Sequence, residues 1–176
     1  MLRKSHSNTL RLINIALLIA LEIILTRFFS VTFPMVRIGF GFIPIAIVAI
    51  MYGPMWAGVT YAIADFIGMM LFPTGGGYFP GFTFSFFLVG IIYGFVLYGH
   101  TVTFKRAILA SASAAILVHL LLNTYWLSIL LGNSYIALLP IRIVKCAVMI
   151  PIEGVLIPLV YNSIFTKIPA FNRTIS

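Results

Sequence analysis

Long apolar segments run through almost the whole chain, and they constrain its fold more than any motif does. Hydrophobic residues make up 62% of the 176 residues, and charged residues make up 8%. A helix needs about 20 mostly apolar residues to cross the hydrocarbon of a bilayer. All three acidic residues, Glu22, Asp65 and Glu153, lie inside such segments. A carboxylate at membrane depth is costly and usually has a partner or a function. The sequence therefore predicts an integral membrane protein that contains a polar site.

We predict an all-α integral membrane protein with six transmembrane helices in a single transmembrane domain, 1–176. The expected spans are about 12–31, 41–54, 56–72, 82–100, 105–131 and 141–166. Gly53-Pro54 interrupts the stretch 41–72, which could form one long kinked span or two short ones. A proline suits the first turn of a helix, so two spans with a tight turn between them are possible.

The distribution of basic residues favours six spans with both termini in the cytoplasm. Six spans place seven of the eleven basic residues on the side of the termini: Arg3, Lys4, Arg11, Lys105, Arg106, Lys167 and Arg173. This is the arrangement that the positive-inside rule describes. The net charge of +8 is thus explained by orientation in the membrane. Nucleic acid is not expected as a partner, because no basic stripe with interleaved aromatics lies on a polar face.

Four basic residues remain at or near the outward ends of the predicted spans, where the positive-inside rule does not explain them. They are Arg27, Arg37, Arg142 and Lys145. An anionic ligand that arrives from outside would account for them. The outward loops 31–40 and 73–81 combine glycine, proline and aromatic residues, so they could bend and cover a ligand. The third outward loop is expected at 132–140.

Two predicted helices carry polar side chains on one face. Arg142, Lys145, Met149 and Glu153 follow a spacing of i, i+3, i+7 and i+11, which forms one stripe along a helix. This stripe is either the wall of a polar cavity or a pair of cations that reach the rim plus one internal Glu–Lys contact. His119, Asn123 and Trp126 share a face of the preceding span. This face either lines a site or contains a packed histidine.

Two further patterns are less specific. Tyr61, Asp65 and Met69 share a face, and Asp65 is a partner for an arginine, an acceptor for a ligand or a helix cap. Ala16 and Ala20 form a small-xxx-small pair, which allows close approach of another helix in lipid.

Motifs for catalysis, nucleotides and metals are not found. Gly75-Gly76-Gly77 lacks the Gly-Lys-Ser/Thr of a phosphate loop. The three histidines are scattered without metal-ligand spacing, and Cys146 is the single cysteine. We therefore expect no enzyme activity, no cofactor, no metal site and no use of ATP by this chain.

At this point the chain resembles a known family. The run GFIPIAIVAIMYGPMWAGVTYAIADFIG, followed by FPTGGGYFPGFTFS and GIIYG, is similar to the folate-specific S component of energy-coupling factor (ECF) vitamin transporters. The later Asn123-Thr-Tyr and the segment LPIRIVK fit the same pattern. The resemblance implies the ECF S-component fold in the plasma membrane, with six helices and one vitamin bound near the outer face. It also implies a transmembrane coupling subunit that docks on Ala16 and Ala20, and two cytoplasmic ATPases.

The residues noted above agree with folate as the ligand. Folate carries two carboxylates on its glutamate tail and a flat pterin head rich in N–H donors. We expect cations to hold the tail by charge-assisted hydrogen bonds, and polar and aromatic side chains to surround the head. The tail is assigned to Arg142, Lys145 and Arg37. The head is assigned to Asp65, Asn123, His119 and Glu153, with Trp126, Tyr78 and Phe82 stacking on it.

Other functions remain open at this stage. The same fold could bind another vitamin, such as riboflavin or thiamin, although outward cations argue against thiamin, which is itself a cation. A membrane enzyme acting on lipid head groups usually has clustered acidic metal ligands, and the three acidic residues are not clustered in sequence. A stand-alone secondary transporter would be expected to show an internal repeat, and none is visible.

Overall fold

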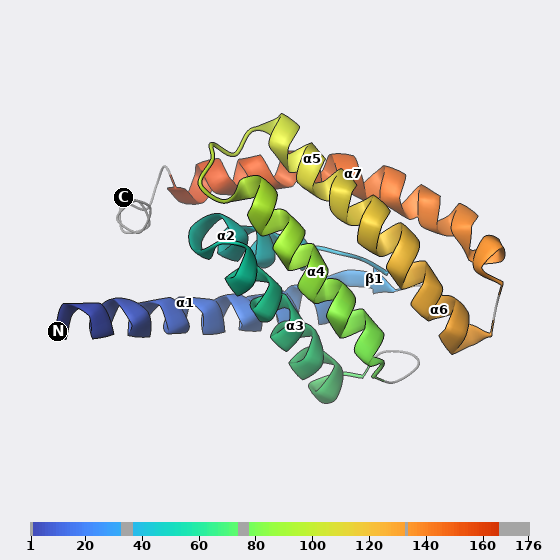
Figure 1. Cartoon of the computed structure of the whole chain (residues 1–176), viewed down its shortest axis with the longest axis horizontal. Coiled ribbons are helices and arrows are strands. Elements are labelled where there is room, and N and C mark those ends of the chain that lie inside the picture. The colour runs from blue at the N-terminus through green and yellow to red at the C-terminus, as the bar shows by residue number, and fades with distance from the viewer. Residues whose placement is uncertain (1, 33–36, 74–77, 133, 166–176) are drawn as a thin grey trace.

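Helices that run alternately in opposite directions make up most of the structure, so the start of α1 and the end of α7 lie at the same end (Figure 1). The computed structural model describes residues 2–32, 37–73, 78–132 and 134–165. The elements in chain order are α1 (Leu2–Arg27), β1 (Ser30–Thr32), β2 (Arg37–Gly39), α2 (Phe42–Tyr52), α3 (Pro54–Leu71), α4 (Pro80–Leu97), α5 (Phe104–Ala114), the π-helix η1 (Ala115–Leu122), α6 (Asn123–Leu131) and α7 (Tyr135–Phe165).

The helical membrane fold is confirmed. In the described part of the chain, five helical segments are long and apolar enough to cross a membrane. These segments are Asn8–Arg27, Pro54–Leu71, Pro80–Leu97, Phe104–Leu131 and Tyr135–Ser163. The chain therefore crosses the membrane several times.

The segment predicted as the second span forms a short apolar helix that is buried in the core. α2 has 11 residues, or about 16 Å at 1.5 Å per residue, which is roughly half of the ~30 Å hydrocarbon layer. Ile45, Val48 and Ala49 are each 0% exposed. A helix that is apolar on every side is stable where other protein covers it. The surrounding helices α1, α3, α4 and α7 supply that cover.

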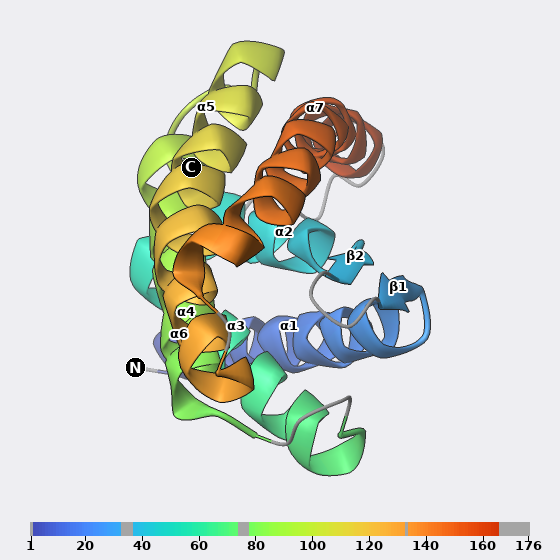
Figure 2. The ribbon, with the colours of Figure 1, turned by 90° about the vertical axis from the view of Figure 1, so that its right-hand side faces the viewer.

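Two of the predicted loops are partly regular structure. Within the expected loop 31–40, β1 and β2 pair in antiparallel register, with Val31 opposite Ile38. Figures 1 and 2 both place this hairpin between α1 and α7. The hairpin is an addition to the all-α prediction. α7 begins at Tyr135 and not near 141, so Pro140 lies inside the helix. Helices in membranes tolerate proline because neighbouring groups satisfy the backbone carbonyl that it leaves without a donor.

The start of the first helix also differs from the prediction. α1 begins at Leu2 and ends at Arg27, whereas the sequence predicted a span over 12–31. The polar residues before the apolar segment continue the same helix. The backbone conformation of a helix does not change where the helix leaves the membrane. Hydropathy therefore predicts the span inside the membrane and not the first residue of the helix.

Gly90 and Gly94 allow the backbones of α3 and α4 to approach each other. A Cβ added at Gly90 would lie 2.4 Å from the carbonyl oxygen of Ala57, and one added at Gly94 would lie 2.1 Å from Cα of Pro54. Both distances are far shorter than real Cβ contacts. The two glycines have the GxxxG spacing that lets membrane helices pack closely. The α3–α4 contact therefore depends on the absence of side chains at these positions.

We predict that Gly94→Ala lowers the thermal unfolding midpoint of the detergent-purified protein. Replacing glycine by alanine inside a helix normally stabilises it by about 1 kcal/mol. Overpacking costs about 1–3 kcal/mol. At a site where two backbones are in contact, we expect the cost of overpacking to be the larger of the two. Ala147→Val adds volume at an exposed position of α7 and is the control. A midpoint equal to or above that of the wild type would contradict the close α3–α4 contact.

Candidate ligand-binding site

A π-helix lies in the middle of the fifth spanning segment and carries His119. η1 covers Ala115–Leu122, between α5 and α6. Asn123 follows directly, and its Nδ2 lies 3.0 Å from Nδ1 of His119. The Thr124 hydroxyl donates to the carbonyl oxygen of His119 at 3.4 Å. π-Helical turns are rare and occur frequently at functional sites. The sequence predicted that His119 and Asn123 share a face, and the structure brings them together, but nothing in the sequence indicated a π-helix.

α7 runs beside η1 and α6, and one contact fixes their relative position (Figures 1 and 2). The Cys146 thiol donates to the carbonyl oxygen of Ala115 at 3.8 Å. The two segments are antiparallel, so one turn back along α7 corresponds to one turn forward along η1. Arg142 therefore lies opposite His119. The charges of Lys145 and Arg142 both act on the His119 imidazole, in agreement with this register.

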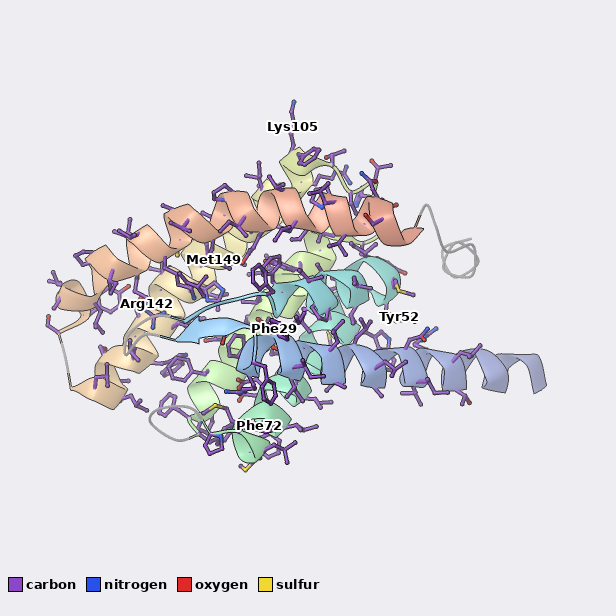
Figure 3. All side chains as sticks on the ribbon, turned by 180° about the vertical axis from the view of Figure 1, so that it is seen from behind. Phe29, Tyr52, Phe72, Lys105, Arg142 and Met149 are labelled. Carbon is purple, nitrogen blue, oxygen red and sulfur yellow. The ribbon has the colours of Figure 1, made fainter. Side chains whose placement is uncertain are left out.

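Arg142 is a buried side chain and not a residue at the rim. It is 6% exposed, and Arg142 and Met149 both lie on the side of α7 that faces the bundle, whereas Lys105 projects away from the molecule (Figure 3). Because α7 begins at Tyr135, Arg142 lies seven residues into the helix, about 10 Å from its start. The helix therefore begins about two turns earlier than the expected span, because Pro140 does not end it.

Two buried polar atoms in this region have no hydrogen-bond partner among the described residues. They are Nε of Arg142 and Oδ1 of Asn123. Asn123 is 5% exposed. Buried polar atoms in native proteins are nearly always satisfied by protein, water or a ligand. An unmatched donor and an unmatched acceptor on two neighbouring helices are therefore suited to a polar ligand.

Glu153 is held by a different helix. The Tyr93 hydroxyl of α4 donates to Oε2 of Glu153 at 2.5 Å, and both residues are buried. The residues of the predicted stripe do lie along one helix, but Glu153 is eleven residues beyond Arg142, about 16 Å along the axis. The structure therefore places Glu153 well away from His119 and Asn123. The sequence did not identify Tyr93 as its partner.

The aromatic candidates fall into two groups at the start of α4. The Trp126 indole N–H donates to the Ser85 hydroxyl at 3.2 Å. Phe79 lies between Trp126 and Phe82, with ring centroids 5.7 Å and 5.8 Å away. Tyr78 instead packs edge-to-face on Phe66 of α3, at 5.4 Å. Trp126 and Phe82 therefore belong to one aromatic cluster, and Tyr78 packs on α3 instead.

Asp65 is part of a polar network that joins α3, α4 and α1. The Thr83 hydroxyl donates to Oδ2 of Asp65 at 2.8 Å and lies 3.3 Å from the Tyr78 hydroxyl. The Arg27 guanidinium is attracted by the charges of Asp65 and Glu22. It also lies against the α3 backbone, since a Cβ at Gly68 would be 3.0 Å from Nη2 of Arg27. Of the three roles considered for Asp65, the attraction to Arg27 agrees with that of a partner for an arginine.

The remaining candidates are less closely connected to this region. The Arg37 side chain lies outside the described residues, although its backbone begins β2. Ala16 and Ala20 are exposed on α1. Several large apolar side chains on the same helix are exposed as well, namely Leu10, Leu12, Ile13, Leu17, Leu21 and Ile24.

Comparison with known proteins points to one family. Residues 10–161 match the family model described as ECF transporter, substrate-specific component. The chain is 44% identical over 167 residues to "Folate transporter FolT" of Clostridium novyi (strain NT), covering 92% of this chain and 96% of that relative. It is 28% identical over 152 residues to "Folate transporter FolT" of Leuconostoc mesenteroides, covering 83% of this chain and 81% of that relative.

A solved structure is also similar. The crystal structure of FolT bound with folic acid superimposes with a TM-score of 0.80 and 36% sequence identity. The similarity covers 85% of this chain and 91% of that one. It therefore includes nearly all of the elements described above.

We predict that Arg27 and Asp65 are energetically coupled. Asp65→Asn keeps an acceptor for Thr83 but removes the negative charge next to a half-buried guanidinium. A double-mutant cycle with Arg27→Met should give a coupling free energy of about 1 kcal/mol or more, measured by thermal or denaturant unfolding in detergent. The control cycle pairs Asp65→Asn with Arg11→Met, at the far end of α1, and should be additive. Additivity in both cycles would rule out the ion pair.

Proposed function

The chain belongs to the substrate-specific components of ECF transporters, and we propose that its ligand is folate. The observation that carries this proposal is the cluster of Arg142, His119 and Asn123, which is buried between α7, η1 and α6 and leaves a donor and an acceptor unmatched among the described residues. Nearby cations suit an anionic vitamin, because charge-assisted hydrogen bonds to carboxylates are strong. The aromatic cluster of Phe79, Phe82 and Trp126 offers flat surfaces for a heteroaromatic ring.

We further propose that the chain captures folate from outside the cell and delivers it inward with a transmembrane coupling subunit and two cytoplasmic ATPases. The chain has no phosphate loop of its own, so the energy has to come from other subunits. The exposed Ala16 and Ala20 suit close contact with a helix of the coupling subunit.

The arrangement of cations suggests how an extended folate could be oriented. Arg142 and Lys145 lie about two and three turns inside α7, whereas Arg37 begins β2, in the connection that follows the outward end of α1. We propose that the glutamate tail is held toward Arg37, while the head lies deeper, toward His119 and Asn123.

Calorimetric titration of the purified full-length chain tests the ligand class. Folic acid should bind tightly with one-to-one stoichiometry, whereas thiamin should not bind, because a cation would face Arg142 and Lys145. Riboflavin is the second comparison ligand. If riboflavin binds tightly and folic acid does not bind, folate is not the ligand. The assignment of the chain to the family would be unaffected. Uptake of folate by cells that lack the ATPase subunits would contradict the importer mechanism.

A second pair of ligands tests the tail. Pteroic acid contains the head and the benzoate but lacks the glutamate. Arg37→Ala should weaken folic acid about 10-fold or more, the equivalent of one charge-assisted hydrogen bond, and should leave pteroic acid within about threefold. Lys145→Ala is measured in parallel, because the sequence assigned the tail to Lys145 as well. Lys105→Ala, which removes a charge from the exposed start of α5, is the control and should change neither affinity. Equal losses for the two ligands in Arg37→Ala would show that Arg37 does not hold the tail.

A further inference from the structure

We propose that Arg11 is a positioning residue for assembly with the coupling subunit, because it clamps α1 to the turn between α2 and α3. The inference rests on the proposed function, in which Ala16 and Ala20 receive a helix of the coupling subunit. It goes further by naming the side chains that hold those alanines in one orientation. Arg11 acts on the partner through the placement of α1, and the alanines make the contact.

The first argument is that α1 has few other attachments near Arg11. Among the described side chains of this helix, Ile15, Glu22 and Ile23 are buried. Glu22 and Ile23 lie about three turns beyond Arg11. The first turns of α1 extend away from the other helices (Figure 1). A helix segment with so few buried contacts is mobile unless specific interactions hold it.

The second argument is that two polar side chains of α1 meet the same aromatic residue. The Arg11 guanidinium lies 5.7 Å from the ring centroid of Tyr52 and 5.7 Å from that of Trp56. Nδ2 of Asn14, one turn further along α1, donates to the Tyr52 hydroxyl at 3.1 Å. Tyr52 lies next to α1 in Figure 3 as well. A cation near the faces of two rings is attracted to both. The three contacts constrain the distance of α1 from α2 and its rotation about its own axis.

The third argument is that the turn that carries these rings is itself firmly held. Tyr52 ends α2, and nine of the 11 residues of α2 are buried. Gly53 has a φ of 86°, which favours glycine, and Pro54 begins α3. The Tyr98 ring at the end of α4 packs on the same turn, since a Cβ at Gly53 would lie 3.5 Å from it. The clamp therefore joins α1 to a well-fixed part of the bundle.

The fourth argument is that Arg11 and the two alanines lie on opposite faces of α1. At 3.6 residues per turn, Ala16 is about 140° and Ala20 about 180° around the helix from Arg11. Both alanines are exposed, whereas Arg11 is half-buried. A clamp on the Arg11 face therefore turns the alanine face away from the α2–α3 turn, where a partner helix can reach it.

The consequence is that assembly and vitamin binding can be separated. Without the clamp, a partner helix has to order α1 when it binds, and the cost of that ordering lowers the affinity of assembly. The candidate vitamin site is built from η1, α6 and α7, which are not part of the clamp. Removal of the clamp should therefore leave the affinity for the vitamin unchanged.

The test measures the two affinities separately on the full-length chain in nanodiscs. One is the affinity for the purified complex of the coupling subunit and two ATPases, and the other is the affinity for folic acid by calorimetry. Arg11→Gln should weaken assembly about tenfold and leave folic acid binding within about threefold. Lys105→Gln removes the same charge from the exposed start of α5 and should change neither affinity. Assembly of Arg11→Gln at wild-type affinity would overturn the proposal.

A double-mutant cycle tests whether Arg11 acts through the aromatic rings. Trp56→Leu removes one ring of the clamp. If the two side chains act as a unit, the double variant Arg11→Gln/Trp56→Leu should weaken assembly no more than the stronger single variant does. Fully additive losses would show that Arg11 acts independently of the ring, and they would also overturn the proposal.

The remaining outcomes distinguish this proposal from the proposed function. If the wild-type chain binds folic acid but does not assemble with the coupling subunit, the importer mechanism fails and the role of Arg11 fails with it. If Arg11→Gln loses folic acid binding as much as assembly, its role is general stability, and the positioning role alone is overturned. If Arg11→Gln does not fold, Asn14→Leu decides, because it removes the hydrogen bond to Tyr52. Asn14→Leu should weaken assembly about threefold, and wild-type affinity in that variant would overturn the proposal.

Discussion

Carboxylates inside a helical membrane bundle have to be paired, and the packing of this protein is arranged around that requirement. Each acidic side chain accepts a hydrogen bond from a hydroxyl group. The pairs are Thr26 to Glu22 at 2.6 Å, Thr83 to Asp65 at 2.8 Å and Tyr93 to Glu153 at 2.5 Å. Two of the pairs join different helices, α4 to α3 and α4 to α7. The third lies beside Gly41, where an added Cβ would be 2.9 Å from Oε1 of Glu22. Asp65 and Glu153 therefore connect helices, whereas Glu22 is paired within α1.

The pairing of the carboxylates contrasts with the unmatched polar atoms of Arg142 and Asn123 near η1. A bundle that supplies a hydroxyl to every carboxylate has nonetheless left Arg142 Nε and Asn123 Oδ1 without a partner among the described residues. Burying a polar group without a hydrogen bond costs free energy. A ligand that completes them would gain specificity as well as affinity, because a competitor with the wrong pattern would leave the same atoms unsatisfied. The π-helix contributes by fixing His119 and Asn123 in contact.

The sequence predicted the membrane class, the order of the helices and the His119–Asn123 face, because these depend on composition and short-range spacing. Hydropathy could not show that the helix in segment 41–54 is covered by protein on nearly every side, because it does not distinguish cover by lipid from cover by protein. The sequence analysis expected a loop at 132–140, whereas α7 begins at Tyr135. The Glu153–Tyr93 bond joins residues 60 positions apart. No local pattern encodes a contact of that kind, so it required the folded structure.

Two arginine side chains, Arg11 and Arg27, attach α1 to the rest of the bundle. Near its first turns, the Arg11 guanidinium lies 5.7 Å from the ring centroids of both Tyr52 and Trp56, which flank the α2–α3 turn. At its other end, Arg27 meets the network of Asp65. Between these two attachments, Ala16 and Ala20 remain exposed. A helix fixed at both ends and open in the middle can receive another helix without being pulled away from its own bundle. Because Asp65 also accepts a hydrogen bond from Thr83 in the first turn of α4, a displacement of α4 at this point would act on the helix that carries the alanines.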